Sequence, residues 1–140
     1  FIDSEMKQIT SSAVLSPEGV DWSNSVTLTF ENGCQALLHS NMRSLTRNEG
    51  VIYGKKGYIE VINTNNPEAV IVHDQTGAVV ETLKLPEQIT GYEYEVAACM
   101  EALKQGQLEC KQMPHSETLK MMGILDEIRR QWGMKYPCEK

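Results

Sequence analysis

Hydrophobic and polar positions follow two different periods along the chain. Up to about residue 85 apolar side chains tend to recur at every second position, and from about residue 90 they recur every three or four positions. The first period is typical of strands and the second of helices. The order along the chain is therefore strands first, then helices.

The cleanest alternation is at residues 26–30, which read Val-Thr-Leu-Thr-Phe. Apolar side chains point to one face of such a strand and hydroxyl side chains to the other. Asn-Gly follows at residues 32–33. This pair is a strong signal for a tight hairpin, so we expect residues 34–41 to form the return strand.

A second hairpin is expected at residues 50–62, where two β-rich runs flank the turn Gly54-Lys55-Lys56-Gly57. Glycine reaches positive φ without a Cβ clash, which a tight reversal requires. We expect this hairpin in the middle of the sheet. Further strands are predicted at residues 7–16, 69–73 and 79–85. The links are too short for parallel crossovers, so neighbouring strands should pair antiparallel.

Two helices should follow the strands. Thr90 and Glu93 have the spacing of a capping box, and Gly106 suits the end of the first helix. Ser116 is expected to cap the second helix and Gly133 to close it. The predicted apolar stripes are Tyr92, Val96, Cys99, Met100 and Leu103 in the first helix, and Met121, Met122, Leu125, Ile128 and Trp132 in the second. An ion pair is expected between Asp126 and Arg130, one turn apart.

The predicted fold class is α+β: an open, mostly antiparallel β-sheet of about six or seven strands, with two C-terminal helices packed on one face. Residues 1–140 are expected to form a single domain, because this length supports one hydrophobic core. Two helices cover only part of one sheet face, and an uncovered, half-apolar face usually meets a partner. The interface candidates on it are Thr27, Thr29, Gln35, Leu37 and His39.

Charge and composition narrow the possible partners. The formal net charge of −6 argues against a nucleic-acid or anionic-membrane partner, because both favour a basic surface. No apolar run approaches the length of a membrane span. The four cysteines match no zinc spacing, and we expect Cys34 and Cys99 to be small buried hydrophobes in a reducing cytoplasm. The predicted location is cytoplasmic.

No catalytic set stands out from the residues alone. His39, His73 and His115 are far apart in sequence and lack metal-ligand spacing; His73 is expected to be exposed at a strand end. The sequence contains no Gly-x-Gly-x-x-Gly, phosphate-binding or nucleophile-elbow motif. We therefore expect no metal site, no cofactor site and no catalytic residue in this chain.

Several stretches taken in order resemble a known family. They are Phe-Glu-Asn-Gly at residues 30–33, the hairpin at 51–61, Gly-Tyr-Glu-Tyr-Glu-Val at 91–96, His-Ser-Glu-Thr at 115–118, and the closing helix at 122–133. The series resembles the C-terminal domain of the glucose–fructose oxidoreductase / inositol dehydrogenase / MocA (Gfo/Idh/MocA) family. The closing helix is most similar to the dihydrodiol dehydrogenase and xylose dehydrogenase branch.

The resemblance implies the later part of an enzyme that oxidises or reduces a sugar, polyol or related alcohol with NAD or NADP. In this family an N-terminal Rossmann domain carries the glycine-rich loop, and a Glu-Lys-Pro motif carries the catalytic lysine. Both lie upstream of the matched region. The resemblance thus implies that this chain alone is inactive, that its partners are its own Rossmann domain and a small-molecule substrate, and that the open sheet forms a homodimer or homotetramer.

For the substrate pocket the resemblance suggests Tyr92, Tyr94 and Arg43, because the start of the first helix lies near the cleft in such folds. Tyr92 also fits the apolar stripe of its helix, where an aromatic ring is good core material. Two other functions stay open: a non-catalytic sugar-sensing regulator, and a stand-alone dimerisation module that shares the fold.

Overall fold

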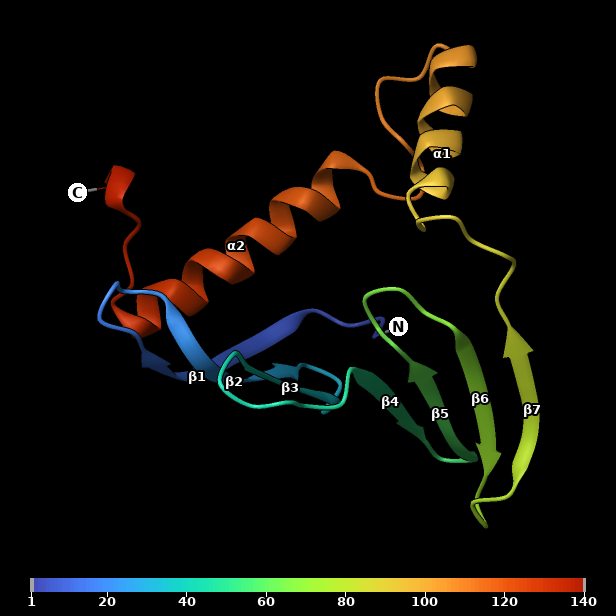
Figure 1. The fold of residues 1–140 in the computed structure, drawn as a ribbon, viewed down its shortest axis with the longest axis horizontal. Coiled ribbons are helices and arrows are strands. Elements are labelled where there is room, and N and C mark those ends of the chain that lie inside the picture. The colour runs from blue at the N-terminus through green and yellow to red at the C-terminus, as the bar shows by residue number, and fades with distance from the viewer. Residues whose placement is uncertain (1, 140) are drawn as a thin grey trace. The chain divides into compact units, whose positions relative to one another are not determined.

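The computed structural model describes residues 2–139, which contain seven β-strands, two α-helices and one short 3₁₀ helix (Figure 1). In chain order they are β1 (Met6–Leu15), β2 (Asp21–Phe30), β3 (Gln35–Asn41), β4 (Glu49–Gly54), β5 (Gly57–Ile62), β6 (Ala69–Asp74), β7 (Val79–Lys84), α1 (Glu93–Lys104), α2 (His115–Trp132) and η1 (Pro137–Glu139). All strand pairs are antiparallel. The predicted α+β class, with antiparallel strands followed by two helices, is confirmed.

The strands form two sheets rather than one, a three-stranded sheet β1-β2-β3 and a four-stranded sheet β4-β5-β6-β7. The chain divides accordingly into two compact units. The discontinuous unit comprises residues up to 46 and from 113 onward, and the continuous unit comprises Arg47–Gln112. The assignment of residues 1–140 to one domain stays a prediction.

The first sheet has the hairpin that its sequence indicates. Gly33 has a φ of 83°, its N–H donates to the Phe30 carbonyl oxygen, and the Asn32 side chain accepts from the Cys34 N–H at 3.0 Å. In β2 and β3, Val26 lies opposite Leu38 and Thr27 opposite Leu37, so the two faces alternate as expected. Cys34 lies in this turn and is exposed, so the expectation that it is buried is wrong.

Helix α2 packs on one face of this sheet, over β1 (Figure 1). The amide of Gln131 attaches the helix to the strand: its Nε2 donates to the Ile9 carbonyl oxygen at 2.9 Å, and its Oε1 accepts from the Ser11 hydroxyl at 2.7 Å. Val26 of β2, which pairs with Ser11, and Ile128 of α2 are buried, at 7% and 8% exposure. The core of the discontinuous unit therefore lies between α2 and this face.

The start of α2 differs from the expectation that Ser116 caps it. The helix begins at His115, and Pro114 occupies the N-cap position. The extended Pro114 (ψ 155°) offers its carbonyl oxygen to the N–H groups of Glu117 and Thr118. Proline has a fixed φ and no N–H, so it can enter a helix without leaving a donor unpaired.

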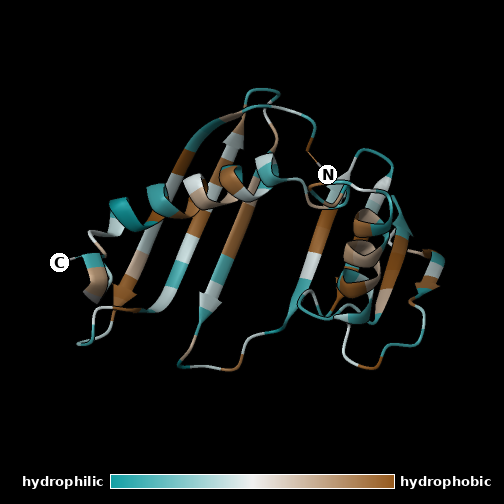
Figure 2. Cartoon of the chain, turned by 90° about the horizontal axis from the view of Figure 1, so that it is seen from above, coloured by the Kyte–Doolittle hydropathy of each residue, from teal (hydrophilic) through white to brown (hydrophobic). Residues whose placement is uncertain are grey.

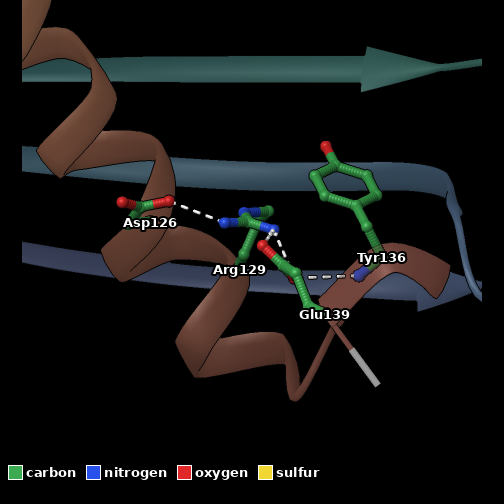
Figure 3. Close-up of polar contacts among 4 residues, drawn as sticks. All are labelled: Asp126, Arg129, Tyr136 and Glu139. Carbon is green, nitrogen blue, oxygen red and sulfur yellow. Dashed lines mark hydrogen bonds and ion pairs between the residues drawn. The ribbon is translucent and has the colours of Figure 1, made fainter.

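The predicted ion pair Asp126–Arg130 is wrong by one residue. Arg129 pairs with Asp126 at 2.7 Å and Arg130 pairs with Glu127, so both pairs are three residues apart. Arg129 also pairs with Glu139 at 3.0 Å and lies over the Tyr136 ring (Figure 3). The ion pair between Arg129 and Glu139 joins η1 to α2. The Tyr136 N–H and the Arg129 guanidinium together lower the pKa of Glu139.

The second sheet begins with the predicted hairpin, in which Gly54 pairs with Gly57 across the two lysines. The hairpin lies at one side of this sheet, with β4 as an outer strand, rather than in its middle. Between β6 and β7 the register shifts at Val72 and His73, which marks a β-bulge. Figure 2 shows hydrophobic bands along these strands. One face of the sheet is apolar, and the residues on that face are Ile52, Ile59, Val61, Val70, Val72 and Leu83.

Helix α1 starts at Glu93 and ends before Gly106, whose φ of 64° confirms the predicted C-terminal glycine. The capping box is present in part. The Glu93 carboxylate reaches back to the Thr90 N–H as expected, whereas the Thr90 hydroxyl accepts from the Tyr92 N–H rather than from that of Glu93. Tyr92, with helical φ and ψ, is the N-cap residue.

The apolar stripe of α1 is largely exposed. Tyr92 is 68% and Leu103 76% exposed, whereas Ala102 is buried. Cys99 is also exposed, so the expectation that it is buried is wrong. Helix α2 packs on a sheet through Ile128, whereas its Met121, Met122 and Leu125 are about half exposed. Helix α1 presents its stripe to solvent.

Candidate functional site

A pocket of about 540 Å³ lies in the continuous unit at the start of α1. We call it the helix-start pocket. Its walls come from residues 65–67, in the loop after β5, and from residues 85–95, which connect β7 to α1. Two of the predicted substrate residues, Tyr92 and Tyr94, line it. The structure thus brings these two candidates into one concave site.

Gly91 allows the two walls to approach each other. Its φ of 87° is a conformation that side chains rarely adopt. A Cβ at this position would stand 3.0 Å from Asn66 Oδ1 and 3.1 Å from Gln88 Oε1. Gln88 also donates to the Pro67 carbonyl oxygen at 3.3 Å, which joins the two walls directly.

Glu93 fixes the backbone that forms the pocket edge. Its carboxylate accepts from the Ile89 N–H at 2.7 Å and from the N–H and hydroxyl of Thr90. Hydrogen bonds from its own N–H, from Ile89 and from Thr90 lower the pKa of Glu93 to about 2. All these partners are local, so we assign Glu93 the role of holding the loop rather than that of an acid or base.

The pocket chemistry is polar and aromatic, with one carboxylate in the lining. The amides of Asn66 and Gln88 each provide both donors and acceptors, and Glu95 adds a carboxylate. The Tyr94 hydroxyl points back to the Glu87 carbonyl oxygen, at 3.4 Å. Such walls fit a ligand with several hydroxyl groups, because amides bind hydroxyls and aromatic rings cover C–H surfaces.

Arg43, the third predicted pocket residue, belongs to the other unit. Its guanidinium lies 4.5 Å from the centre of the Trp22 ring, and the backbone N–H of Arg43 donates to the Asn41 Oδ1. The structure therefore gives Arg43 a stacking partner within the discontinuous unit. Its role in substrate binding stays a prediction.

The five interface candidates share one face of the first sheet. Thr27 pairs with Leu37, Thr29 pairs with Gln35, and His39 follows on the same face. This face is opposite to the one that α2 covers. Leu37 is 78% exposed. Whether a second subunit binds there stays a prediction.

The sequence patterns did not predict a cluster of three side chains in the second sheet. On β5 and β6, the Tyr58 and His73 rings stack with centroids 4.2 Å apart, and Glu60 Oε2 lies 2.9 Å from His73 Nε2. His73 Nδ1 donates to the Gly77 carbonyl oxygen at 3.2 Å. The side chain of His73 is 9% exposed, so the expectation of an exposed histidine is wrong.

The signal for this cluster was present in the strand pattern. Tyr58 and Glu60 share a strand face by their spacing, and antiparallel pairing of β6 with β5 places His73 opposite Tyr58. The missing information was the register of β6, which no local motif specifies. With both ring nitrogens hydrogen-bonded, His73 has a structural role in this sheet.

Residues 2–139 contain neither a metal-binding cluster nor a membrane-spanning helix. No group of three or more histidine, cysteine or acidic side chains in this part of the chain could hold a metal ion. None of the described helices is long and apolar enough to cross a membrane.

Comparison with known proteins found relatives among dehydrogenases. The chain is 25% identical over 134 residues to scyllo-inositol 2-dehydrogenase (NADP(+)) IolU of Bacillus subtilis, covering 96% of this chain and 40% of the relative. It is 30% identical over 141 residues to trans-1,2-dihydrobenzene-1,2-diol dehydrogenase of Danio rerio, covering 97% of this chain and 42% of the relative. The chain therefore spans about two fifths of the length of these relatives.

Among solved structures, UDP-N-acetylglucosamine 3-dehydrogenase GnnA from Acidithiobacillus ferrooxidans matches with a TM-score of 0.61. The match covers 74% of this chain and 33% of that protein at 15% identity, so it shows a shared fold. No family model matches the chain. The relatives confirm the resemblance inferred from the sequence motifs.

Proposed function

We propose, from its homology to the C-terminal part of Gfo/Idh/MocA dehydrogenases, that the chain is the substrate-binding and oligomerisation domain of an NAD(P)-dependent oxidoreductase. The substrate is a sugar, polyol or related alcohol, and the reaction is hydride transfer between it and the nicotinamide. The observation that carries the proposal is similarity over 96% of the chain to one region of a dehydrogenase.

The helix-start pocket supports the substrate class. Its side-chain amides and tyrosine rings match what a polyol needs, namely hydrogen bonds to hydroxyls and an aromatic surface for C–H groups. Tyr92 and Tyr94 are the proposed contacts. Arg43 is a further candidate from the discontinuous unit.

The residues of this chain do not fit a dinucleotide. A nicotinamide dinucleotide needs a glycine-rich turn at a helix N-terminus, and the sequence contains no Gly-x-Gly-x-x-Gly. In the proposal the cofactor and the catalytic lysine belong to an N-terminal Rossmann domain, the chain alone is inactive, and the enzyme is cytoplasmic.

The proposal also includes assembly into a homodimer or homotetramer. The exposed face with Thr27, Gln35 and Leu37 supports it, because a half-apolar sheet face outside the helix contact is typical of a protein interface.

The decisive experiment has two steps. The reading frame upstream of Phe1 is determined first, and a glycine-rich loop with a Glu-Lys-Pro motif is expected there. The complete protein is then assayed for reduction of NAD⁺ and NADP⁺ with an inositol, a trans-dihydrodiol and a nucleotide sugar. Turnover of one of these supports the proposal, and inactivity on every polyol and sugar tested would overturn it.

Tyr94→Phe tests the pocket in the active protein. Loss of one hydroxyl contact should raise KM about fivefold, since one hydrogen bond contributes about 1 kcal/mol. Tyr136→Phe is the matched control, because Tyr136 lies in the discontinuous unit over Arg129. An equal change in KM from the two substitutions would contradict substrate binding in the helix-start pocket.

A non-catalytic sugar sensor is the second candidate, since the pocket chemistry suits sugar binding without turnover. A glycine-rich loop upstream with no catalytic lysine, together with sugar binding measured by calorimetry, would favour it. A stand-alone dimerisation module would show neither motif upstream.

A further inference from the structure

Two cysteines of the continuous unit face each other. The Cys110 thiol donates a hydrogen bond to the Cys99 sulfur, with the sulfurs 3.7 Å apart. Cys99 lies in the middle of α1, and Cys110 lies in the segment after the helix. Both are free thiols. Within residues 2–139 the other two cysteines, Cys34 and Cys138, are free thiols outside this pair.

The geometry points to a reversible disulfide site: we propose that Cys99 and Cys110 form an intramolecular disulfide when the protein meets a peroxide. A disulfide bond is about 2.05 Å long, so the sulfurs must approach by roughly 1.7 Å. Rotation of two short side chains supplies such a movement, and the segment carrying Cys110 lies outside regular helices and strands. The inference is independent of the proposed function.

The reaction balances with one hydrogen peroxide per disulfide. Cys99 is exposed and meets the oxidant first, whereas Cys110 is half-buried. Peroxide converts the Cys99 thiol to a sulfenic acid and releases one water. The Cys110 sulfur then attacks the sulfenic sulfur, the S–S bond forms, and the hydroxyl leaves with the thiol proton as a second water. Two electrons pass from the thiols to the peroxide.

The hydrogen bond to Cys99 also holds the pKa of the Cys110 thiol above its usual range. While Cys99 is reduced and accepts this hydrogen bond, Cys110 stays protonated and reacts poorly with peroxide, since the thiolate is the nucleophile. Oxidation of Cys99 removes that acceptor, and the Cys110 proton then leaves with the sulfenic hydroxyl as water. The assigned role of Cys110 is that of the resolving thiol, which acts once Cys99 has been oxidised.

The disulfide would close a ring around the end of α1. The ring contains the last helical turn, the αL residue Gly106 and the exposed Leu108. A cross-link at this place limits opening of the helix end and of the segment that follows it. Oxidation thus acts on the same helix whose start forms the pocket.

Trypsin mapping of the intact chain tests the proposal directly, because Lys104 separates the two cysteines. The chain is treated with a small excess of hydrogen peroxide, alkylated, and digested without reductant. We expect the peptide that ends at Lys104 to be linked to the peptide of residues 105–111. The chain mass should fall by about 2 Da, the two hydrogens lost on disulfide formation. Alkylatable thiols should fall from four to two.

The control variants separate this pair from the other cysteines. Cys34→Ser removes an exposed cysteine outside the pair and should leave the linked peptides intact. Cys99→Ser should abolish them and leave Cys110 alkylatable. Full alkylation of Cys99 and Cys110 after peroxide treatment of the intact chain, or links from Cys110 to Cys34 in equal yield, would overturn the proposal.

Discussion

Single side chains determine local geometry at the start of α1. Glu93 accepts from the N–H groups of Ile89 and Thr90 and so holds the connection that forms one wall of the helix-start pocket. Gly91, between these residues, leaves room for the side chains of Asn66 and Gln88. At the residue scale, the pocket depends on one carboxylate and one absent Cβ.

Acidification should weaken the start of α1. Its hydrogen bonds lower the pKa of Glu93 from 4.5 to about 2 in the folded chain. The stabilisation from this carboxylate is therefore complete above about pH 4.5, and it is lost as the pH falls toward 2. NMR titration of the Ile89 and Thr90 amide shifts measures this loss of the Glu93 hydrogen bonds.

Glu93→Gln should remove the pH dependence of these two amides. Glu95→Gln changes a neighbouring carboxylate that makes no such contact with the loop, so the dependence should persist. An identical titration curve in the intact chain and in Glu93→Gln would contradict this role for Glu93.

At the scale of elements, the turn between β4 and β5 contains two glycines with unequal roles. A Cβ on Gly57 would come within 1.9 Å of the His73 carbonyl oxygen, whereas a Cβ on Gly54 would meet its nearest atom at 3.5 Å. The absence of a side chain at Gly57 therefore permits β6 to pair next to the turn. At Gly54, by contrast, there is room for a Cβ.

Gly57→Ala should destabilise the continuous unit by about 3 kcal/mol or more, because a backbone clash in a strand pair forces the ladder apart. Gly54→Ala, three residues away, should change the unfolding free energy by less than about 1 kcal/mol. Urea unfolding followed by circular dichroism measures both. Equal losses from the two substitutions would refute the assignment.

The attachment of α2 to β1 depends on Gln131. Its amide makes hydrogen bonds to Ser11 and Ile9 in a partly buried position. Gln131→Ala should cost about 2 kcal/mol of unfolding free energy, at about 1 kcal/mol for each bond.

Arg130→Ala is the control for that substitution. It leaves both Gln131 bonds to β1 in place and removes an exposed ion pair with Glu127, to which Gln131 also donates, and it should cost less than about 1 kcal/mol. Thermal unfolding followed by circular dichroism distinguishes them. A loss from Arg130→Ala equal to that from Gln131→Ala would mean that the Gln131 bonds are not the source.

Local signals in the sequence predicted the elements well, and the reason is physical. The Asn32-Gly33 turn, the alternation in β2 and the glycines after α1 and α2 depend on neighbours within a few residues. The division into two sheets and the stacking of His73 on Tyr58 depend on pairings distant in sequence, which local patterns do not encode.

The pocket residues have a different origin. Tyr92 and Tyr94 are proposed from the family resemblance, and both line the helix-start pocket; their contact with a substrate stays a prediction. Asn66 and Gln88 were missed, because they enter the pocket only when the loop after β5 folds back toward Gly91. Predicting these two residues would require knowledge of that long-range contact, which no short sequence motif indicates.

At the scale of the whole molecule, the exposed face of the first sheet bears on assembly. Leu37 lies on the face opposite to that covered by α2, and Leu38 points to the other face. Leu37→Asp should reduce self-association if the open face is the interface, because a buried unpaired carboxylate is costly. Sedimentation at high micromolar concentration measures the effect.

Leu38→Asp is the neighbouring control, as Leu38 is 52% exposed on the other face. It should leave the association unchanged. A chain that is monomeric at high micromolar concentration, or one that associates equally in both variants, would contradict an interface at Thr27, Gln35 and Leu37.

The discontinuous unit has a consequence for synthesis. Ser11 and Gln131, which join β1 to α2, are 120 residues apart, and the whole continuous unit lies between them. On the ribosome β1, β2 and β3 therefore emerge first and wait uncovered while residues 47–112 are made. The continuous unit can complete its sheet during that interval. The unit whose strands are made first is thus the last to close, and its unfinished sheet is the surface that a chaperone would meet.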